Sequence, residues 1–352
     1  MKTKFIGVLV CLLLMTTVFS VGKPIERETM NPELNDPSPR AIGVDVPLWN
    51  IGNSWSYEIK MLSLNIEETN QSYHITITTE NVTLKVINDA GSNYTIAFDA
   101  KINGNASISY RLETGFINIT ANLNDTQLAG TIVYNKSDLG IKQIQINLLG
   151  RLNAKIIELP SISLRHPIPI RGETNISLIA NYDVPYPLIT FPLDVGTIWG
   201  RPAINISLDG TIQSRWLKRM TIINNIARRH WRFVEFLTKI MGIDSVSLRN
   251  MSDICDDILP IIKIGYVLNK YFNGNIFKIA EIPPIFICTD TEDVTVKAGT
   301  FNAYNISVGI GQGNIYYAPN VGNIIKISGH FTDAFPYAKN LEIQLIHTNF
   351  PQ

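Results

Sequence analysis

Apolar and polar residues alternate along most of the segment from Ser72 to Leu149, where β-branched side chains are frequent. His74–Thr78 and Ser107–Leu112 are two clear stretches of this kind. A period of two is typical of a β-strand that buries one face and exposes the other. Turn-forming residues recur at intervals of roughly 12 residues, namely at Asn88–Gly91, Asn103-Gly104 and Asn124-Asp125. The pattern therefore predicts an antiparallel meander of short strands with one polar face.

The segment from Val294 to Lys326 predicts three further strands in succession. Gly299 and Gly322 suit turn or bulge conformations that other side chains resist. Large aromatic side chains are suited to cross-strand contacts in this segment; they are Phe301, Tyr304, Tyr316 and Tyr317. The glycine-rich tip at Gly309–Gly313 superficially resembles a nucleotide-binding loop. A strand rather than a helix is predicted after it, so no helix N-terminus is present to hold phosphate.

Two stretches of the chain resemble each other. In Pro47–Trp55 and in Pro192–Trp199, Pro-Leu is followed by an aliphatic residue and glycine, and a tryptophan stands three residues after the glycine. This weak internal repeat predicts two related β lobes. Coincidence is the alternative, because the spacing from proline to glycine differs by one residue between the two stretches.

Prolines become frequent over residues 150–192. Proline suits edge strands and crossover loops better than central strands, because it cannot donate to the ladder. We place the boundary between the lobes here, and expect an N-terminal β lobe of residues 47–185 and a C-terminal β lobe of residues 186–352.

Residues 214–272 predict a two-helix insertion in the second lobe. Apolar residues recur at helical spacing over residues 217–237, after a suitable N-cap at Ser214, and the opposite face is basic. A second helix is predicted from Ser252, with acidic residues in its first turn. The insertion covers an open face of the sheet with its charges solvated, or it presents a basic helix over residues 215–240 to anionic lipid or to an apolar groove.

The N-terminus has the features of a secretory signal: two lysines, the apolar run Phe5–Phe19 and a small-residue cleavage site. We expect residues 1–22 to be a signal peptide. An uncleaved membrane anchor is the alternative, although an apolar run of about 15 residues is shorter than the ~20 needed to span a bilayer. Residues 23–46 predict a disordered leader, and the folded region begins near Pro47. The protein is therefore expected to be secreted or held at the cell surface.

Composition limits the partners and the covalent chemistry of the chain. The formal net charge is zero and 17% of the residues are charged, which gives no basis for binding nucleic acid. Two cysteines remain after the signal peptide, Cys255 and Cys288. In an oxidising compartment they predict one disulfide, with two buried thiols as the alternative.

Asn-x-Ser/Thr triplets occur 11 times, where composition alone predicts roughly four. They begin at Asn70, Asn81, Asn93, Asn105, Asn118, Asn124, Asn135, Asn175, Asn205, Asn250 and Asn305. The excess is consistent with a heavily N-glycosylated surface. A chain biased toward Asn, Ile and Thr, in which strand ends naturally contain Asn-Ile-Thr, is the alternative.

No motif indicates catalysis, a metal or a cofactor. The five histidines are scattered and form no metal-binding pair. The serine nucleophile elbow, the zinc-protease motif and the P-loop are all absent from the sequence. Asp290, Glu292 and Asp293 supply too few ligands for a calcium loop. We predict no catalytic, cofactor-binding or metal-ligating residue, and an enzyme is the least favoured class.

The residues Ala298–Tyr304 and Tyr316–Lys326 fit a pattern AGTF-x-A-Y followed by YY-x-P-x-V-G-x-I-x-K. In this they resemble uncharacterised secreted prokaryotic proteins, mainly archaeal, although proline is more usual where Lys297 stands. The resemblance implies a curved antiparallel sheet similar to the periplasmic lipoprotein-carrier type, in which a half-barrel wraps helices and leaves an apolar cleft. It covers about 35 residues well, and no catalytic residues come with it.

We expect a mainly β protein with two antiparallel curved sheets or half-barrels and a two-helix insertion. The expected function is that of an exported, non-enzymatic binding or carrier module, with an apolar groove for a lipid or similar ligand between sheet and helices. The candidate groove-lining residues are Trp216, Met220, Trp231, Phe301, Tyr304 and Tyr316. The alternative is a glycosylated cell-surface structural or interaction protein without a small ligand.

Overall fold

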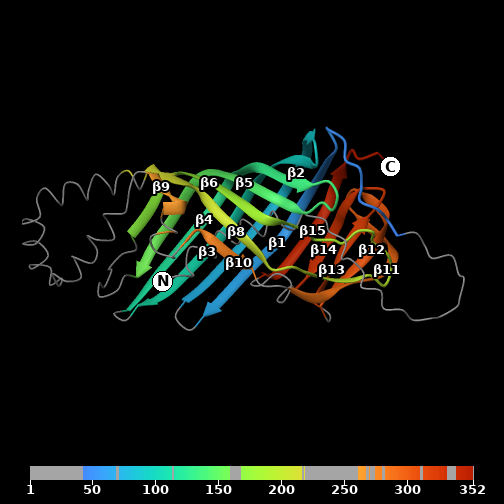
Figure 1. The fold of residues 1–352 in the computed structure, drawn as a ribbon. Coiled ribbons are helices and arrows are strands. Elements are labelled where there is room, and N and C mark those ends of the chain that lie inside the picture. Colours follow the sequence, from blue (N-terminus) through green and yellow to red (C-terminus); the bar gives the residue numbers. More distant parts are fainter. Residues whose placement is uncertain are drawn as a thin grey trace, which may run out of the picture.

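The computed structural model describes residues 43–68, 71–112, 115–158, 168–215, 218, 261–266, 269, 274–279, 282–309, 312–330 and 338–351. This part of the protein is mainly β, and its strands form one large antiparallel sheet (Figure 1). The strands are β1 (Ser54–Glu68), β2 (Gln71–Ala90), β3 (Asn93–Leu112), β4 (Gly115–Asn135), β5 (Ile141–Glu158), β6 (Ile168–Tyr186), β7 (Ile198–Arg201), β8 (Ile204–Ser214), β9 (Ile261–Lys263), β10 (Ile276–Ile279), β11 (Ile282–Val296), β12 (Gly299–Val308), β13 (Gly313–Ala318), β14 (Asn323–Gly329) and β15 (Ala338–Thr348).

A single sheet replaces the two sheets expected from the sequence. Its strand order is β10-β8-β6-β5-β4-β3-β2-β1-β15-β14-β13-β12-β11-β7, with β9 paired to β8. The junction between the two halves of the chain is the antiparallel pair of β1 and β15, which runs from Trp55 opposite Thr348 to Leu64 opposite Ala338. Buried residues from both halves also belong to one hydrophobic core. The expectation of two sheets was therefore wrong, because the first strand completes its ladder with the last one.

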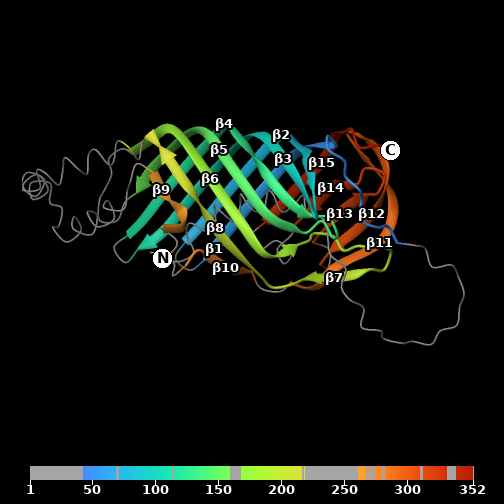
Figure 2. The same ribbon diagram turned by 45° about the horizontal axis from the view of Figure 1, so that its top comes forward.

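The sheet curls until its two edges come together along the chain (Figure 2). Only two residues separate β7 from β8, and two separate β10 from β11, although β7 and β10 stand at opposite ends of the strand order. Ile279 pairs with Ile204, and three residues further along, Ile282 pairs with Arg201, so the register is the same on both sides of this junction. We call the place where the β10–β8 pair continues into the β11–β7 pair the seam. The sheet is not closed into a barrel.

Side chains alternate between the two faces of the sheet as the sequence predicted. On β1, Trp55, Tyr57 and Ile59 are buried on the inner face, while Glu58 and Lys60 lie on the outer face. Alternation of this kind follows from the two-residue repeat of an extended strand. The apolar inner faces of the strands enclose the core, and the outer face is polar.

The strands are longer than expected, because turn-like residues lie inside them. Asn103-Gly104 belongs to β3 and Asn124-Asp125 to β4, so neither is a hairpin turn; Asn88–Gly91 does reach the β2–β3 turn, where Gly91 has φ 57°. The register instead shifts at Ile102/Gly104 between β3 and β4, and at Thr78/Val82 between β2 and β3. These shifts are β-bulges, which bend a strand without ending it.

The two Gly-x-x-Trp stretches form the same local structure. Gly52 has φ 97° and Gly196 has φ 88°, conformations that side chains resist. In the first turn the amide of Asn53 donates to the carbonyl of Asn50 at 3.0 Å; in the second, the amide of Thr197 donates to the carbonyl of Asp194 at 3.1 Å. The repeat is therefore present as two equivalent turns, each delivering a buried tryptophan to the core, although both turns serve one sheet.

The two-helix insertion expected over residues 214–272 is not supported. Ser214 is the last residue of β8 rather than a helix cap, and Ile261–Lys263 forms β9, which pairs with Thr211–Gln213. β-Branched residues at this point satisfy the edge of β8 better than they would extend a helix. Most of the predicted insertion, including residues 219–260, lies outside the described residues, as do the signal segment and most of the leader.

Cys288 carries a free, buried thiol on β11, and no disulfide is seen in the described part of the chain. Its expected partner, Cys255, lies outside the described residues. The ordered contacts begin slightly before Pro47, since Val44 forms a two-hydrogen-bond bridge with Leu193. No helix of the described residues is long and apolar enough to cross a membrane.

Candidate functional surface on β1 and β15

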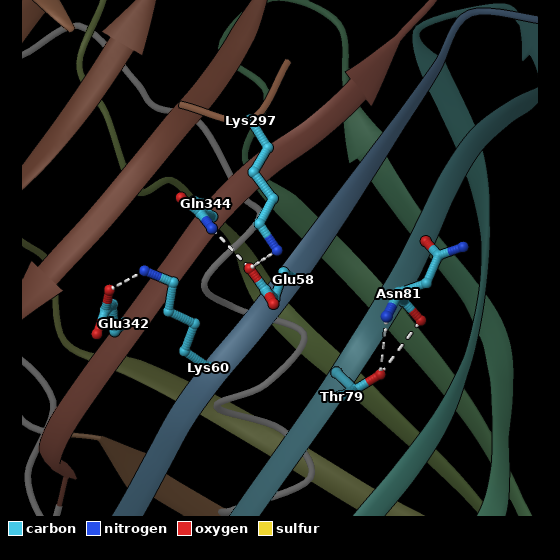
Figure 3. A network of polar contacts seen from close by, with 7 residues as sticks. All are labelled: Glu58, Lys60, Thr79, Asn81, Lys297, Glu342 and Gln344. Carbon is cyan, nitrogen blue, oxygen red and sulfur yellow. Dashed lines mark hydrogen bonds and ion pairs between the residues drawn. The ribbon is translucent and has the colours of Figure 1, made fainter. Parts of the chain in front are cut away.

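A network of polar side chains lies on the outer face where β1 meets β15 (Figure 3). Glu58 and Lys60 belong to β1, and Glu342 and Gln344 to β15. Lys297 reaches them from the turn between β11 and β12, which is fixed on β15 because the amide of Ala298 donates to the carbonyl of Leu345 at 3.3 Å. We call these five side chains the β1–β15 polar cluster.

Two ion pairs and one amide hydrogen bond hold the cluster. Nζ of Lys297 lies 2.8 Å from Oε2 of Glu58, and Nε2 of Gln344 donates to the same oxygen at 2.6 Å. Gln344 and Glu58 are directly opposite each other in the sheet, so their contact follows from the register. Nζ of Lys60 lies 2.6 Å from Oε1 of Glu342. Every charge in the cluster therefore has a partner of opposite sign or a donor.

The hydrogen bonds shift the pKa values of two members in the directions that favour their charged forms. The bond from Lys297, and then that from Gln344, lower the pKa of Glu58. The bond to Glu342 raises the pKa of Lys60. The side chain of Lys297 is 57% exposed, so solvent screens this electrostatic gain, and each such pair stabilises the fold by about 0.2–1 kcal/mol. The cluster therefore makes a small electrostatic contribution to holding β1, β15 and the β11–β12 turn together.

A bulge in β2 adjoins the cluster. Thr79 is 3% exposed, and its hydroxyl accepts from the amide of Asn81 at 3.3 Å and donates to the carbonyl of the same residue at 3.2 Å. The ladder between β2 and β3 passes from the pair Thr78–Asn103 directly to the pair Val82–Ala100. Residues 79–81 therefore have no ladder partner on β3, and Glu80 and Asn81 are both exposed, one after the other.

The predicted groove-lining residues that are described do not all face the same way. Phe301 is buried in the core. Tyr304 is half-buried and lies directly opposite the buried Tyr317. Tyr316 is half-buried on the outer face, where Nζ of Lys326 lies 5.7 Å from the centre of its ring. The other three candidates, Trp216, Met220 and Trp231, lie outside the described residues.

The predicted glycosylation sites share one face of the sheet. Among those whose side chains are described, Asn81, Asn105, Asn124, Asn175 and Asn205 are exposed, and Asn93, Asn135 and Asn305 are half-buried. Each stands next to a buried or inward-facing residue of its strand, so each belongs to the outer face. Asn118 lies within β4, while Asn70 and Asn250 are outside the described residues.

A buried arginine at the seam was not anticipated from the sequence. Arg201 is 3% exposed; its Nη1 donates to the hydroxyl of Tyr186 at 3.0 Å, and its guanidinium lies 4.7 Å from the ring centre of Phe286. The ring of Trp199 stacks on that of Phe286, with the ring centres 5.6 Å apart. These contacts join β6, β7 and β11 where the two sheet edges meet. Only the single basic residue after Trp-Gly could have drawn attention to it.

No group of three or more metal-ligating side chains comes together within the described ranges. Comparison with protein-family models, with curated proteins and with solved structures finds no match to this chain. The likeness to secreted prokaryotic proteins with the AGTF-x-A-Y pattern therefore stays a hypothesis, and function has to be argued from the two faces of the sheet.

Proposed function

We propose that the protein is an exported binding module that holds an apolar molecule, such as a lipid, against the inner face of its sheet. The observation that carries this is a set of apolar side chains on the inner face that are only partly buried. Ala106, Leu123, Ile176 and Ile212 pack against the core yet keep part of their surface exposed. Ile176 and Ile212 lie directly opposite each other on β6 and β8.

These side chains are less buried than those at the other end of the inner face. Near β13 and β14 the interior is filled by the segments that precede β1 and β7. Trp49 and Phe191 of these segments are buried there, and Phe191 packs edge-on to Tyr317 with the ring centres 5.5 Å apart. An apolar ligand would bury the partly exposed side chains, as the segments before β1 and β7 bury the inner face near β13 and β14. Each methylene that it buries contributes about 0.8 kcal/mol, so a chain of about ten carbons would bind usefully.

The proposal places the site on the inner face of the sheet itself, rather than in the groove expected between sheet and helices. A basic helix over residues 215–240 that contacts a membrane surface stays a prediction on residues outside the described part. The same applies to export through residues 1–22. Neither is needed for the inner face to bind an apolar chain.

The test is native mass spectrometry of the protein purified from its natural source, followed by displacement of a fluorescent fatty acid. A co-purifying lipid is expected, and Ile176→Gln should weaken probe binding about tenfold, since a buried amide without partners costs about 1–3 kcal/mol. Ser177→Gln, on the outer face of the same strand, is the matched control and should bind normally. Equal affinity of the two variants, or a protein without lipid that does not bind the probe, would rule the proposal out.

A second candidate is a glycosylated cell-surface structural or interaction protein without a small ligand. The outer face favours it, because uncharged polar residues from adjacent strands lie side by side there. Asn147, Ser177 and Thr211 form one such row across β5, β6 and β8. Site-resolved glycan mapping separates the two functions: dense glycans with no bound lipid would support a surface coat.

A further inference from the structure

The described Asn-x-Ser/Thr triplets are not equivalent in the folded protein. N-glycosylation replaces one hydrogen on Nδ2, so this nitrogen must be accessible, and the hydroxyl two residues later must lie on the same side. Both conditions depend on the strand, its bulges and the partners of the asparagine side chain.

Three asparagines already use their Nδ2 within the fold. Nδ2 of Asn135 donates to the hydroxyl of Ser137 at 2.7 Å and to Oδ1 of Asp138 at 2.9 Å. Nδ2 of Asn205 donates to Oδ2 of Asp183 at 2.6 Å. Nδ2 of Asn305 donates to Oε1 of Glu292 at 2.9 Å. Asn135 uses both hydrogens of its Nδ2, so a sugar there would have to displace one of these bonds. At Asn205 and Asn305 one hydrogen of Nδ2 stays free, but the charge-assisted bond holds the amide against a carboxylate, and the side chain has to leave that bond before a transferase can enclose it.

Other sites are restricted by their backbone. At Asn124 the bulge in β4 separates the two functional residues, because Asn124 is exposed whereas Thr126 is fully buried. Asn105 pairs with Thr76 on one side and Asn122 on the other, and Asn175 is similarly held between two strands. A transferase must separate such a residue from its neighbours before it can enclose the acceptor segment.

Asn81 combines the favourable features. It is exposed, and its Nδ2 makes no hydrogen bond to another residue of the described part of the chain. The hydroxyl of Thr83 lies beside it and donates to Oδ1 of Asn81 at 3.3 Å. The bulge takes the backbone of Asn81 out of the β2–β3 ladder, and the amide and carbonyl of Asn81 instead bond to the side chain of Thr79 (Figure 3).

We propose that Asn81 is the preferred N-glycan acceptor of the folded protein, and that Asn135, Asn205 and Asn305 are poor acceptors in that state. The co-substrate is a lipid-phosphate-linked oligosaccharide. Nδ2 of Asn81 forms a bond to C1 of the first sugar, the bond from C1 to the phosphate oxygen breaks, and one Nδ2 proton leaves to a base as the lipid phosphate departs. The glycan would stand on the outer face beside the β1–β15 polar cluster and away from the inner face.

The test uses the full chain, produced without glycans and folded. It is incubated with a single-subunit oligosaccharyltransferase and its lipid-linked oligosaccharide, and occupancy at each site is measured by peptide mass spectrometry. Synthetic peptides spanning Asn81, Asn205 and Asn305 serve as unfolded acceptors. We expect the three peptides to be modified at comparable rates. In the folded chain, Asn81 should be modified at least about tenfold faster than Asn205 or Asn305, because paired strands must open before they react.

Two variants identify the site. Thr83→Ala should abolish modification of Asn81, whereas Ser207→Ala, which removes the equivalent hydroxyl from the Asn205 triplet, should leave it unchanged. Modification of Asn205 or Asn305 as fast as that of Asn81 in the folded chain would overturn the proposal, as would no modification of folded Asn81 or of its peptide. The inference shares with the proposed function only the assumption of export. Lipid binding is measured on unglycosylated protein, so failure of one leaves the other standing.

Discussion

Trp55 donates its indole N–H to the carbonyl oxygen of Val321 at 2.8 Å, across 266 residues of sequence. Both residues are buried, and the contact fastens the first strand of the sheet to the turn between β13 and β14. Trp49 makes an equivalent bond to the carbonyl of Gly322 at 2.9 Å. The turn that follows the Tyr316-Tyr317 pair is thus held by two tryptophans from the other end of the chain.

Replacement of Trp55 should be strongly destabilising. Trp55→Phe removes the donor to a buried carbonyl and leaves a cavity beside Phe350, which stacks on the indole at 5.9 Å. Together these effects should lower the free energy of unfolding by about 2–4 kcal/mol in urea titrations. Tyr57→Phe is the control, because it keeps the aromatic ring and loses the hydroxyl bond to the carbonyl of Ile324, and it should lower that free energy by about 1 kcal/mol. Equal losses for the two variants would argue against the role of the indole.

The equivalent turns at Gly52 and Gly196 should respond alike to substitution. A Cβ at either position meets nothing within 4 Å, so the effect of alanine is conformational rather than steric. Gly52→Ala and Gly196→Ala should each lower the free energy of unfolding by about 1–2 kcal/mol, because φ is positive at both. Asparagine, which tolerates this conformation better, should be less harmful at both sites in thermal unfolding. A large effect at one turn and none at the other would show that they are not equivalent.

The β1–β15 polar cluster should give stability a modest dependence on pH. Since the pKa of Glu58 is lowered in the folded protein, its contribution is present above the unfolded value of about 4.3 and is lost as pH falls through the folded pKa. Glu58→Gln should therefore lower the unfolding free energy at pH 7 by less than about 1 kcal/mol, and the difference from wild type should disappear in acid and shrink in high salt. A constant difference at every pH would exclude an electrostatic origin.

Lys60 should act in the opposite sense at alkaline pH. Its pKa is raised in the folded protein, so its contribution is present below the unfolded value and is lost as pH rises through the folded pKa. The unfolding free energy of Lys60→Gln should be lower than that of wild type at pH 7. The two values should converge once pH has risen above the folded pKa of Lys60. A difference between Lys60→Gln and wild type that is the same at every alkaline pH would argue against the ion pair with Glu342.

Cys288 should be chemically inert while the protein is folded. Burial, with smaller contributions from Asp194 and Asp290, raises the pKa of its thiol to about 12. Iodoacetamide at pH 8 should not label Cys288 in the native protein, because almost no thiolate is present, and should label it after unfolding without reductant. Labelling that requires both denaturant and reductant would instead indicate a disulfide, as the two-cysteine composition had suggested.

The class of fold was predictable because alternation is a local property. The inner and outer faces of β1 and β3 follow directly from residues two positions apart. The strand ends were not predictable in the same way. Asn103-Gly104 has the composition of a turn, yet a Cβ on Gly104 would lie 2.5 Å from the carbonyl oxygen of Thr76. Glycine is needed there for the close approach of β2, which only the neighbouring strand can impose.

Long-range pairing explains the other errors. Nothing near Ser54–Glu68 indicates that Ala338–Thr348 will pair with it, so one sheet was divided into two. The members of the β1–β15 polar cluster likewise come from three distant segments, none with a local motif. The excess of Asn-x-Ser/Thr triplets has a simple cause in the alternation: in Asn175-Ile176-Ser177 the outer polar residues flank an inner apolar one. The number of triplets alone is therefore weak evidence for glycosylation.

The pairing of β1 with β15 also sets the order in which the protein can be completed. β1 is made early, but one of its two edges waits for Ala338–Thr348, and the ladder between them joins residues nearly the whole chain apart. Contacts of such sequence separation form slowly, and an unpaired edge in a growing chain invites association with other chains. Until β15 is synthesised, one edge of β1 therefore lacks the strand that covers it in the finished sheet.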